Sequence, residues 1–174
     1  MREFGGIFKE IITSKEIKNR IEELGKKISE DYKNNELVLV GVLKGSFVFM
    51  ADLVRSVDIP LEVDFLEISS YESTASSGIV RITKDLKNSI ENKHVLIVED
   101  IVDTGLTMKF LVEHLNAKKP LSLKIASFLT KPQKYKLNFE INYSGFEIED
   151  IFVVGYGLDY NGKFRNLPSV RIFC

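Results

Sequence analysis

The stretch VLIVEDIVDTGLTM, residues 95–108, predicts a buried strand that turns directly into a helix. The apolar residues of that helix recur at helical spacing and are Met108, Leu111, Val112 and Leu115. Backbone N–H groups at the start of a helix are unpaired and carry partial positive charge, so such a turn can bind an anion. Gly105 allows a phosphate to approach closely, and the hydroxyls of Thr104 and Thr107 can donate to it. The same residue types often serve merely as helix caps, which is the alternative interpretation.

Three acidic residues lie beside this anion-binding turn. Glu99 and Asp100 adjoin at the end of the strand, and Asp103 begins the turn. A carboxylate accepts hydrogen bonds from vicinal sugar hydroxyls and can also hold Mg²⁺. A ligand with both a phosphate and a ribose diol would therefore suit the stretch. The alternative is that Glu99 and Asp100 are ordinary acidic residues at a strand end.

Apolar strands alternate with amphipathic helices along the rest of the chain. Strands are predicted over 36–45, 61–69, 94–98, 122–130 and 150–158, and helices over 13–31, 46–57 and from about 106. This order favours a single α/β domain over residues 1–174, with a parallel sheet covered on both faces. Ligands bind at the carboxyl ends of such strands, so the strand tails at 43–45, 99–107 and 131–132 should surround one crevice.

The composition excludes several classes of protein. The 174 residues include 24 basic and 25 acidic side chains, a balance that favours neither a nucleic-acid partner nor a membrane surface. Cys174 is the one cysteine, so no intrachain disulfide is expected. The N-terminal residues contain no apolar core typical of a signal peptide, and no apolar run reaches the length of a membrane span. We expect a soluble, cytoplasmic protein.

The stretch at 95–107 resembles the phosphoribosyl-diphosphate-binding motif of type I phosphoribosyltransferases: four apolar residues, two acids, two apolar residues and Asp-Thr-Gly-x-Thr. Further segments resemble the hypoxanthine–guanine branch, namely VLKGSFVFMADL (42–53), VDFLEISSY (63–71) and FVVGYGLDYNGKFRNLP (152–168). The resemblance implies a mostly parallel central sheet flanked by helices, a small hood at about 131–174 and a mobile lid loop at about 69–85. It also implies purine salvage, in which a 5-phosphoribosyl group passes from 5-phosphoribosyl diphosphate (PRPP) to hypoxanthine or guanine.

The resemblance implies roles for the residues of the motif. Asp103 would be the general base near purine N7, for which a raised pKa would be useful; alternatively, it caps the following helix. The 5′-phosphate would be held by Asp103, Thr104, Gly105, Leu106 and Thr107. Glu99 and Asp100 would bind the ribose hydroxyls.

Pyrophosphate and Mg²⁺ would be bound by residues from other segments. Lys44 and Gly45 would meet the pyrophosphate through a turn that in this family often contains a cis peptide, and Arg165 would contact it as a fixed cation. Mg²⁺ is the cofactor that the resemblance implies, with Glu99, Asp100 and Asp159 as its residues. The alternative for Lys44 is a solvated lysine in a turn.

The purine site implied by the resemblance comprises Lys131, Phe152, Val153 and Asp159. Lys131 would donate to the 6-oxo group and disfavour adenine, whose amino group offers a donor instead. Phe152 would stack on the purine, and the backbone of Val153 would read the opposite edge. From the sequence pattern without the resemblance, both would be ordinary core residues.

The polar interval at 69–85 would supply the lid. Small and polar side chains predominate in its first ten residues, and such a segment cannot pack a core. The resemblance implies that Ser70 and Tyr71 close over the reacting atoms and exclude water. A plain hairpin loop is the alternative.

Some questions stay open in the sequence. Relatives often carry arginine shortly after the Lys-Pro pair at 131–132, whereas this chain has Lys134, which cannot reproduce a bidentate contact. Rival functions are a phosphoribosyltransferase for xanthine or a pyrimidine, a nucleic-acid-binding regulator, and a nucleotide sensor without turnover. The family commonly forms homodimers or homotetramers, and Lys44 with residues 46–57 is a plausible contact.

Overall fold

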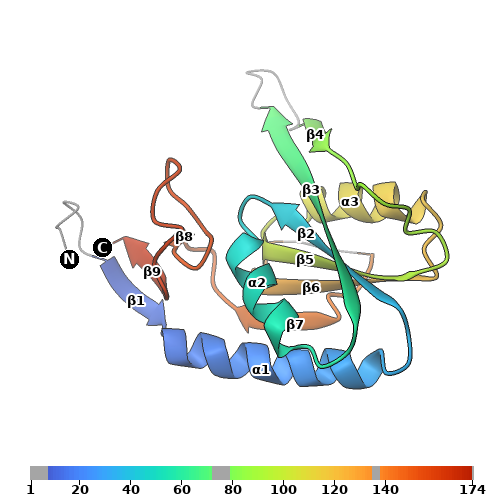
Figure 1. The fold of residues 1–174 in the computed structure, drawn as a ribbon. Helices are drawn as coiled ribbons and strands as arrows, with labels where there is room; N and C mark the ends of the chain where they lie inside the picture. The colour runs from blue at the N-terminus through green and yellow to red at the C-terminus, as the bar shows by residue number, and fades with distance from the viewer. Residues whose placement is uncertain (1–7, 72–78, 135–137, 174) are drawn as a thin grey trace.

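A six-stranded sheet forms the centre of the computed structural model, which describes residues 8–71, 79–134 and 138–173 (Figure 1). Its strands, in spatial order, are β4 (Ile79–Lys84), β3 (Leu61–Tyr71), β2 (Leu37–Leu43), β5 (His94–Val102), β6 (Ser122–Thr130) and β7 (Tyr143–Glu147). All neighbours pair in parallel except β4, which runs antiparallel to β3. The predicted α/β fold with a mostly parallel sheet is therefore confirmed.

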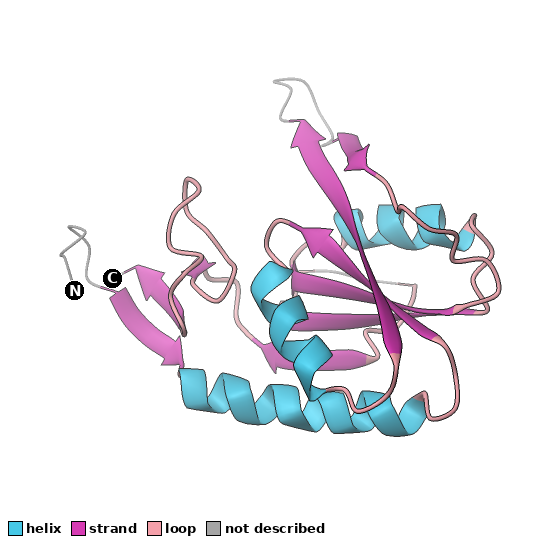
Figure 2. Ribbon diagram, in the orientation of Figure 1, coloured by secondary structure: helices cyan, strands magenta, loops and turns pink. Residues whose placement is uncertain are grey.

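Helices cover both faces of this sheet (Figure 2). Helices α1 (Ser14–Asp31) and α2 (Phe47–Ser56) pack on one face, and α3 (Leu106–Asn116) packs on the other. Along β2, Leu37 and Leu39 join the core beneath α1 and α2, whereas Val38 and Val40 join the core beneath α3. Because successive side chains of a strand point to opposite faces, a continuous apolar run is what a sheet covered on both sides requires.

Helix α1 begins at a capping box. Thr13 is the N-cap; its hydroxyl accepts from the Glu16 amide at 3.3 Å, and the Glu16 carboxylate accepts from the Thr13 amide at 2.8 Å. Further along, the Arg20 guanidinium donates to the carbonyls of Ser144 and Gly145 at 2.8 and 3.0 Å. These bonds hold α1 against the edge strand β7.

A second, three-stranded sheet has the order β1-β9-β8 and comprises β1 (Phe8–Ile12), β8 (Val153–Val154) and β9 (Val170–Phe173). The strand predicted over 150–158 is therefore largely wrong, since only two of its residues form a strand. The backbone leaves extended geometry at Gly155, Tyr156 and Gly157, whose φ angles are 99°, 51° and 99°. We call β1, β8, β9 and the segment 155–169 the hood.

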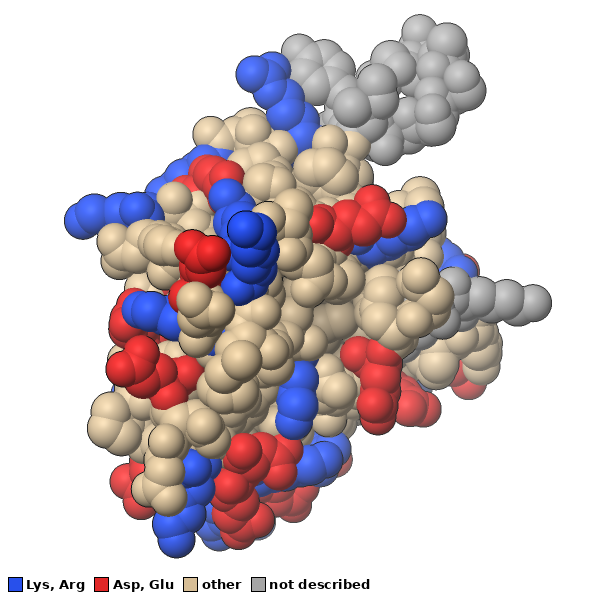
Figure 3. Space-filling model, turned by 90° about the vertical axis from the view of Figure 1, so that its right-hand side faces the viewer, with Lys and Arg blue, Asp and Glu red and all other residues tan. Residues whose placement is uncertain are grey.

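The hood lies off the carboxyl ends of the central strands, where the arrowheads of β2 and β7 point toward it (Figure 1). The predicted lid region, 69–85, falls largely on the hairpin of β3 and β4; its residues 72–78 lie outside the described residues. No helix of the described residues is long and apolar enough to cross a membrane. On the face shown in Figure 3, basic and acidic side chains are interspersed, in keeping with the near-zero net charge.

Candidate active site

The tails of β2, β5 and β6 meet at one crevice beneath the hood, as the sequence predicts. The Lys131 amide donates to the Val102 carbonyl at 3.0 Å, which joins the end of β6 to that of β5. On the other side, Gly45 packs so closely on Asp100 that a methyl group on Gly45 would overlap its carboxylate. Glycine is therefore needed at position 45 to bring the turn after β2 against the end of β5.

The turn after β2 contains a cis peptide bond between Leu43 and Lys44, in agreement with what the family resemblance implies. The Lys44 side chain is exposed, as is expected of a lysine in a turn. Ser46 is fully buried, and its hydroxyl donates to the Val42 carbonyl at 2.6 Å. This bond fixes the start of α2 relative to the end of β2.

The predicted anion-binding turn begins α3. Gly105 is the N-cap in the left-handed region, at a φ of 79°, and no side chain caps the helix. The alternative in which Asp103 caps α3 is therefore wrong. The Leu106 amide donates to the Thr104 hydroxyl over a long 3.5 Å, and the start of a helix offers further amides to a ligand. A cavity of about 80 Å³ lies at the turn and is lined in part by Glu99, Asp103, Thr104, Gly105 and Thr107. The Leu106 side chain is exposed.

Glu99 and Asp100 are not ordinary surface acids. Glu99 is 8% exposed, and its Oε2 has no hydrogen-bond partner among the described residues. Burial, followed by the nearby charge of Asp100, raises the pKa of Glu99 well above its ordinary value. Burial likewise raises the pKa of Asp100, although its Oδ1 accepts from the Ile101 amide at 2.9 Å. A cation or hydroxyl donors would satisfy both carboxylates.

A second cavity, of about 230 Å³, adjoins the first through Asp103, which lines both. The predicted residues that line it are Asp100, Asp103, Lys131, Phe152, Val153 and Asp159. Phe152 is 57% exposed, so the alternative of a core aromatic is wrong, and its ring meets that of Tyr160 edge-on at 5.8 Å. Val153 is 5% exposed, packs in the core as the alternative of an ordinary core residue expects, and pairs with Ile172 of β9.

Two lysines and two aspartates form a charged network at the mouth of this second cavity. The buried ammonium of Lys131 lies 3.2 Å from Asp150 Oδ1 and 3.6 Å from Asp103 Oδ2. Lys134 lies 2.9 Å from Asp103 Oδ1 and 3.0 Å from Asp150 Oδ1. Hydrogen bonds from Lys134 and then Lys131 lower the pKa of Asp150, and those to Asp103 and then Asp150 raise the pKa of Lys134.

The sequence did not predict this network. The sequence indicates only that Lys134 lies near where relatives often carry arginine; in the structure its ammonium pairs with Asp103 and Asp150. No sequence signal pointed to Asp150, because its partners come from a different segment. Its position directly before the apolar residues at 151–154 resembles that of many surface acids.

Asp159 and Arg165 pair within the hood, with Arg165 Nη2 2.6 Å from Asp159 Oδ1. Arg165 Nη1 also donates to the Gly157 carbonyl at 2.5 Å. Among the described residues, no three Asp, Glu, His or Cys side chains already form a metal site. Glu99 lines the smaller cavity, whereas Asp100 and Asp159 line the larger one. The side chains of Ser70 and Tyr71 lie outside the described residues.

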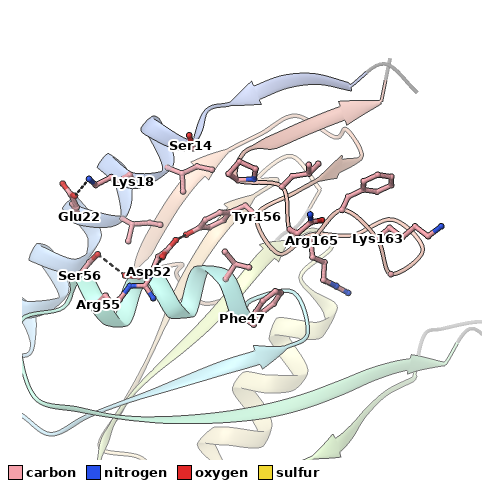
Figure 4. A pocket seen from close by; sticks show the side chains of 18 residues that line it. Ser14, Lys18, Glu22, Phe47, Asp52, Arg55, Ser56, Tyr156, Lys163 and Arg165 are labelled. Carbon is pink, nitrogen blue, oxygen red and sulfur yellow. Dashed lines mark hydrogen bonds and ion pairs between the residues drawn. The ribbon is translucent and has the colours of Figure 1, made fainter. Parts of the chain in front are cut away.

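A larger groove, of about 1130 Å³, lies on the other side of the hood segment (Figure 4). Its walls come from α1, α2 and the segment 162–168, and Arg165 is one of its lining residues. Phe47, at the start of α2, is 45% exposed there. Arg165 is also near enough to Asp100 for its charge to lower the pKa of that carboxyl. The groove and the crevice therefore lie on either side of the same short segment.

Comparison with known proteins gives consistent results. A family model, the phosphoribosyl transferase domain, matches residues 8–161. A hypoxanthine-guanine phosphoribosyltransferase from Dictyostelium discoideum is 53% identical over 163 residues, covering 91% of each chain. The enzyme of that name from Bacillus subtilis (strain 168) is 46% identical over 167 residues, covering 95% of this chain and 93% of its own.

Solved structures agree with the fold. A hypoxanthine phosphoribosyltransferase from Staphylococcus aureus superposes with a TM-score of 0.90 at 47% identity, covering 95% of this chain and 91% of its own. The hypoxanthine phosphoribosyl transferase of Trypanosoma cruzi gives a TM-score of 0.91 at 40% identity, covering 100% and 95%. The similarity therefore extends over the strands, the helices and the hood.

Proposed function

The chain belongs to the phosphoribosyl transferase domain family, and we propose that it is a purine-salvage enzyme acting on hypoxanthine and guanine. It transfers the 5-phosphoribosyl group of PRPP to the base and forms IMP or GMP and pyrophosphate. The observation that carries this proposal is the meeting of two adjoining cavities at Asp103. One has an anion-binding helix start, and the other contains a buried lysine.

The PRPP half of the reaction uses the smaller cavity. The 5′-phosphate accepts from the backbone amides of 103–107 and from the hydroxyls of Thr104 and Thr107. The uncapped start of α3 supports this assignment. Glu99 and Asp100 accept from the ribose hydroxyls, which would supply the donors that the Glu99 carboxylate lacks.

The donor set at the crevice also suits Mg²⁺. Mg²⁺ in enzymes commonly takes one or two carboxylates and completes its coordination with substrate phosphates and water. Glu99, Asp100 and Asp159 would hold it together with PRPP, and the unpartnered Oε2 of Glu99 supports a cation nearby. When bound, Mg²⁺ neutralises the charge of the departing pyrophosphate.

The purine half uses the larger cavity. Lys131 donates to the 6-oxo group, the Phe152 ring stacks on the base, and the Val153 backbone reads the opposite edge. Purine N9 forms its bond to C1′ of the ribose while the C1′–O bond to pyrophosphate breaks and leaves its electron pair on oxygen. Asp103 accepts the proton from N7. Support for this role comes from its position between the two cavities.

Pyrophosphate is bound from the hood side and from the turn after β2. Lys44, the backbone of Gly45 and Arg165 contact it, and Arg165 is held in place by Asp159 and the Gly157 carbonyl. The lid then closes over the reacting atoms through Ser70 and Tyr71 and excludes water from C1′. The hairpin of β3 and β4 carries this lid.

We further infer that residues 1–174 act as a single cytoplasmic domain that associates into homodimers or homotetramers. Support for association comes from the groove beside α2, whose lining includes residues of the predicted contact region 46–57. An exposed Phe47 at this groove suits an apolar contact between copies. Analytical ultracentrifugation that shows only monomer at micromolar concentrations would contradict this assignment.

Pyrophosphate release with PRPP and Mg²⁺ tests the reaction. Hypoxanthine, guanine, xanthine, adenine and uracil are each supplied at saturating concentration. We expect turnover with hypoxanthine and guanine and little with adenine or uracil; the xanthine reaction measures how the 2-position is read. Binding of PRPP with no turnover on any base would instead indicate a nucleotide sensor.

A further inference from the structure

Three consecutive residues of the hood, Gly155, Tyr156 and Gly157, have positive φ angles of 99°, 51° and 99°. Backbone hydrogen bonds hold this segment against residues 165–167. The Tyr156 amide donates to the Leu167 carbonyl at 2.8 Å, and the Gly157 amide donates to the Arg165 carbonyl at 3.0 Å. A side chain in this conformation is uncommon, so Tyr156 is expected to have a specific reason to be there.

Gly157 lies directly on the turn that follows β2. A methyl group on Gly157 would overlap the carbonyl oxygen of Gly45. Gly45 in turn packs against the Asp100 carboxylate with no space for a side chain. Asp100, Gly45 and Gly157 therefore form a close-packed series from β5 to the hood. A shift of residues 155–157 would displace the turn after β2 (Lys44–Ser46), which we call the pyrophosphate turn because it would bind that group.

Tyr156 connects the same segment to α2. Its side chain is 4% exposed, and its hydroxyl donates to Asp52 Oδ2 at 2.5 Å. Figure 4 shows Tyr156 pointing from the hood segment to Asp52 on α2. The ring packs on Phe128 at 4.6 Å between centroids, and Asp52 also pairs with Arg55 one turn along the helix. The bond therefore joins two well-packed elements.

Helix α2 begins at Phe47, immediately after the Lys44–Ser46 turn, so a contact that fixes α2 also fixes this turn. We infer that Tyr156 and Asp52 are positioning residues for PRPP binding. The hydrogen bond between them holds the pyrophosphate turn against Gly157 and Arg165. This inference rests on the proposed function, because it concerns the part of the substrate that the turn and Arg165 would bind. Neither residue touches substrate; they act through Gly45 and Arg165.

Tyr156→Phe tests the inference, because it removes the hydroxyl and leaves the ring packing in place. The expected result is a rise of roughly fivefold to tenfold in KM for PRPP and, in the reverse reaction, in KM for pyrophosphate. The KM for hypoxanthine should stay within about twofold of the native value, because the ammonium of Lys131 is held by Asp103 and Asp150 rather than by the turn or by Arg165.

Tyr143→Phe is the matched control. Tyr143 is 1% exposed, and its hydroxyl donates to Asp31 Oδ2 at 2.6 Å, a bond of the same kind at the end of α1. The control should lower the melting temperature about as much as Tyr156→Phe does and leave both KM values unchanged. Asp52→Asn, which keeps an oxygen acceptor for Tyr156, should restore part of the PRPP affinity that Asp52→Ala loses.

A double variant, Tyr156→Phe with Asp52→Ala, should raise the KM for PRPP no more than the larger single change, since both remove the same bond. The inference is overturned if Tyr156→Phe turns over like the native enzyme, or if it raises the KM values of PRPP and hypoxanthine equally. A native protein that is inactive with every base would overturn the proposed function and this inference with it.

Discussion

Replacing Gly45 with alanine should separate the stability of the fold from the geometry of the crevice. The added methyl group would overlap Asp100 Oδ2 and would lie 3.0 Å from Oδ1. Non-bonded carbon atoms are normally about 3.5–4.0 Å from their neighbours, so the overlapping Asp100 carboxylate must withdraw by roughly 2 Å. Asp100 Oδ1 would then lose the 2.9 Å hydrogen bond that it accepts from the Ile101 amide.

Two effects of different size follow from this displacement. Overpacking of this kind costs about 1–3 kcal/mol of folding free energy, which a native domain tolerates. A misplacement of only about 1 Å at a reacting centre, by contrast, already reduces the rate roughly 10²-fold. We therefore expect a folded Gly45→Ala protein whose kcat/KM for PRPP is about 10²-fold lower.

The assay is pyrophosphate release at varied PRPP and saturating hypoxanthine, together with urea unfolding of the same preparations. Gly41→Ala is the control, since Gly41 lies on β2, the strand that leads into the turn, and its methyl group would be 2.8 Å from atoms of the Phe65 ring, away from the crevice. The control should lose stability and keep its kcat/KM. A Gly45→Ala enzyme with native kcat/KM for PRPP would refute the reasoning.

Three further predictions concern the charged residues. Lys131→Gln should lower kcat/KM for hypoxanthine about 10²-fold. It should also lower the ratio of kcat/KM for hypoxanthine to that for adenine, because glutamine can accept a hydrogen bond from the adenine amino group; an unchanged ratio would contradict the role of Lys131. Asp150→Asn should raise the KM for hypoxanthine about twofold to fivefold, with Glu149→Gln as an inert neighbouring control; equal effects in both would argue against the network. The pKa of Glu99 is higher in the folded than in the unfolded protein. The protonated Glu99 side chain therefore stabilises the fold fully below the unfolded-state pKa, and this stabilisation is lost as pH rises through the folded-state pKa. Without Mg²⁺ or PRPP, urea unfolding should therefore show Glu99→Gln gaining stability relative to native protein as pH rises above about 4.3, and a constant difference would contradict this.

The local pattern of the chain predicts strand β5, the turn after it and helix α3, because the signals there come from neighbouring residues. The apolar run of β5, the glycine at the N-cap of α3 and the capping box of α1 are all of this kind. The edge strand β7, with the sequence YSGFE, was not predicted, since a glycine and polar residues interrupt its apolar pattern. Pairing with β6 and the hydrogen bonds from Arg20, rather than local propensity, stabilise it.

The segment 155–157 shows what local patterns cannot supply. The apolar residues around it favour a strand. Glycine is nevertheless required at position 155 by a contact with Ser169 and at position 157 by a contact with Gly45, both of which are distant in sequence. The pairing of Lys134 with Asp103 and Asp150 similarly brings together three segments. Contacts of this kind depend on the folded arrangement and leave no periodic signal in the chain.

The most direct test of the account is a single-turnover measurement of IMP formation from PRPP and hypoxanthine with native enzyme and the Asp103→Asn variant. Asparagine keeps the shape of the side chain but cannot accept the N7 proton. We predict rapid IMP formation by the native enzyme and a rate roughly 10²- to 10⁴-fold lower in the variant, with PRPP still bound. Equal rates in the two proteins would show that Asp103 is not the base, and the absence of IMP with native enzyme would contradict the proposed reaction itself.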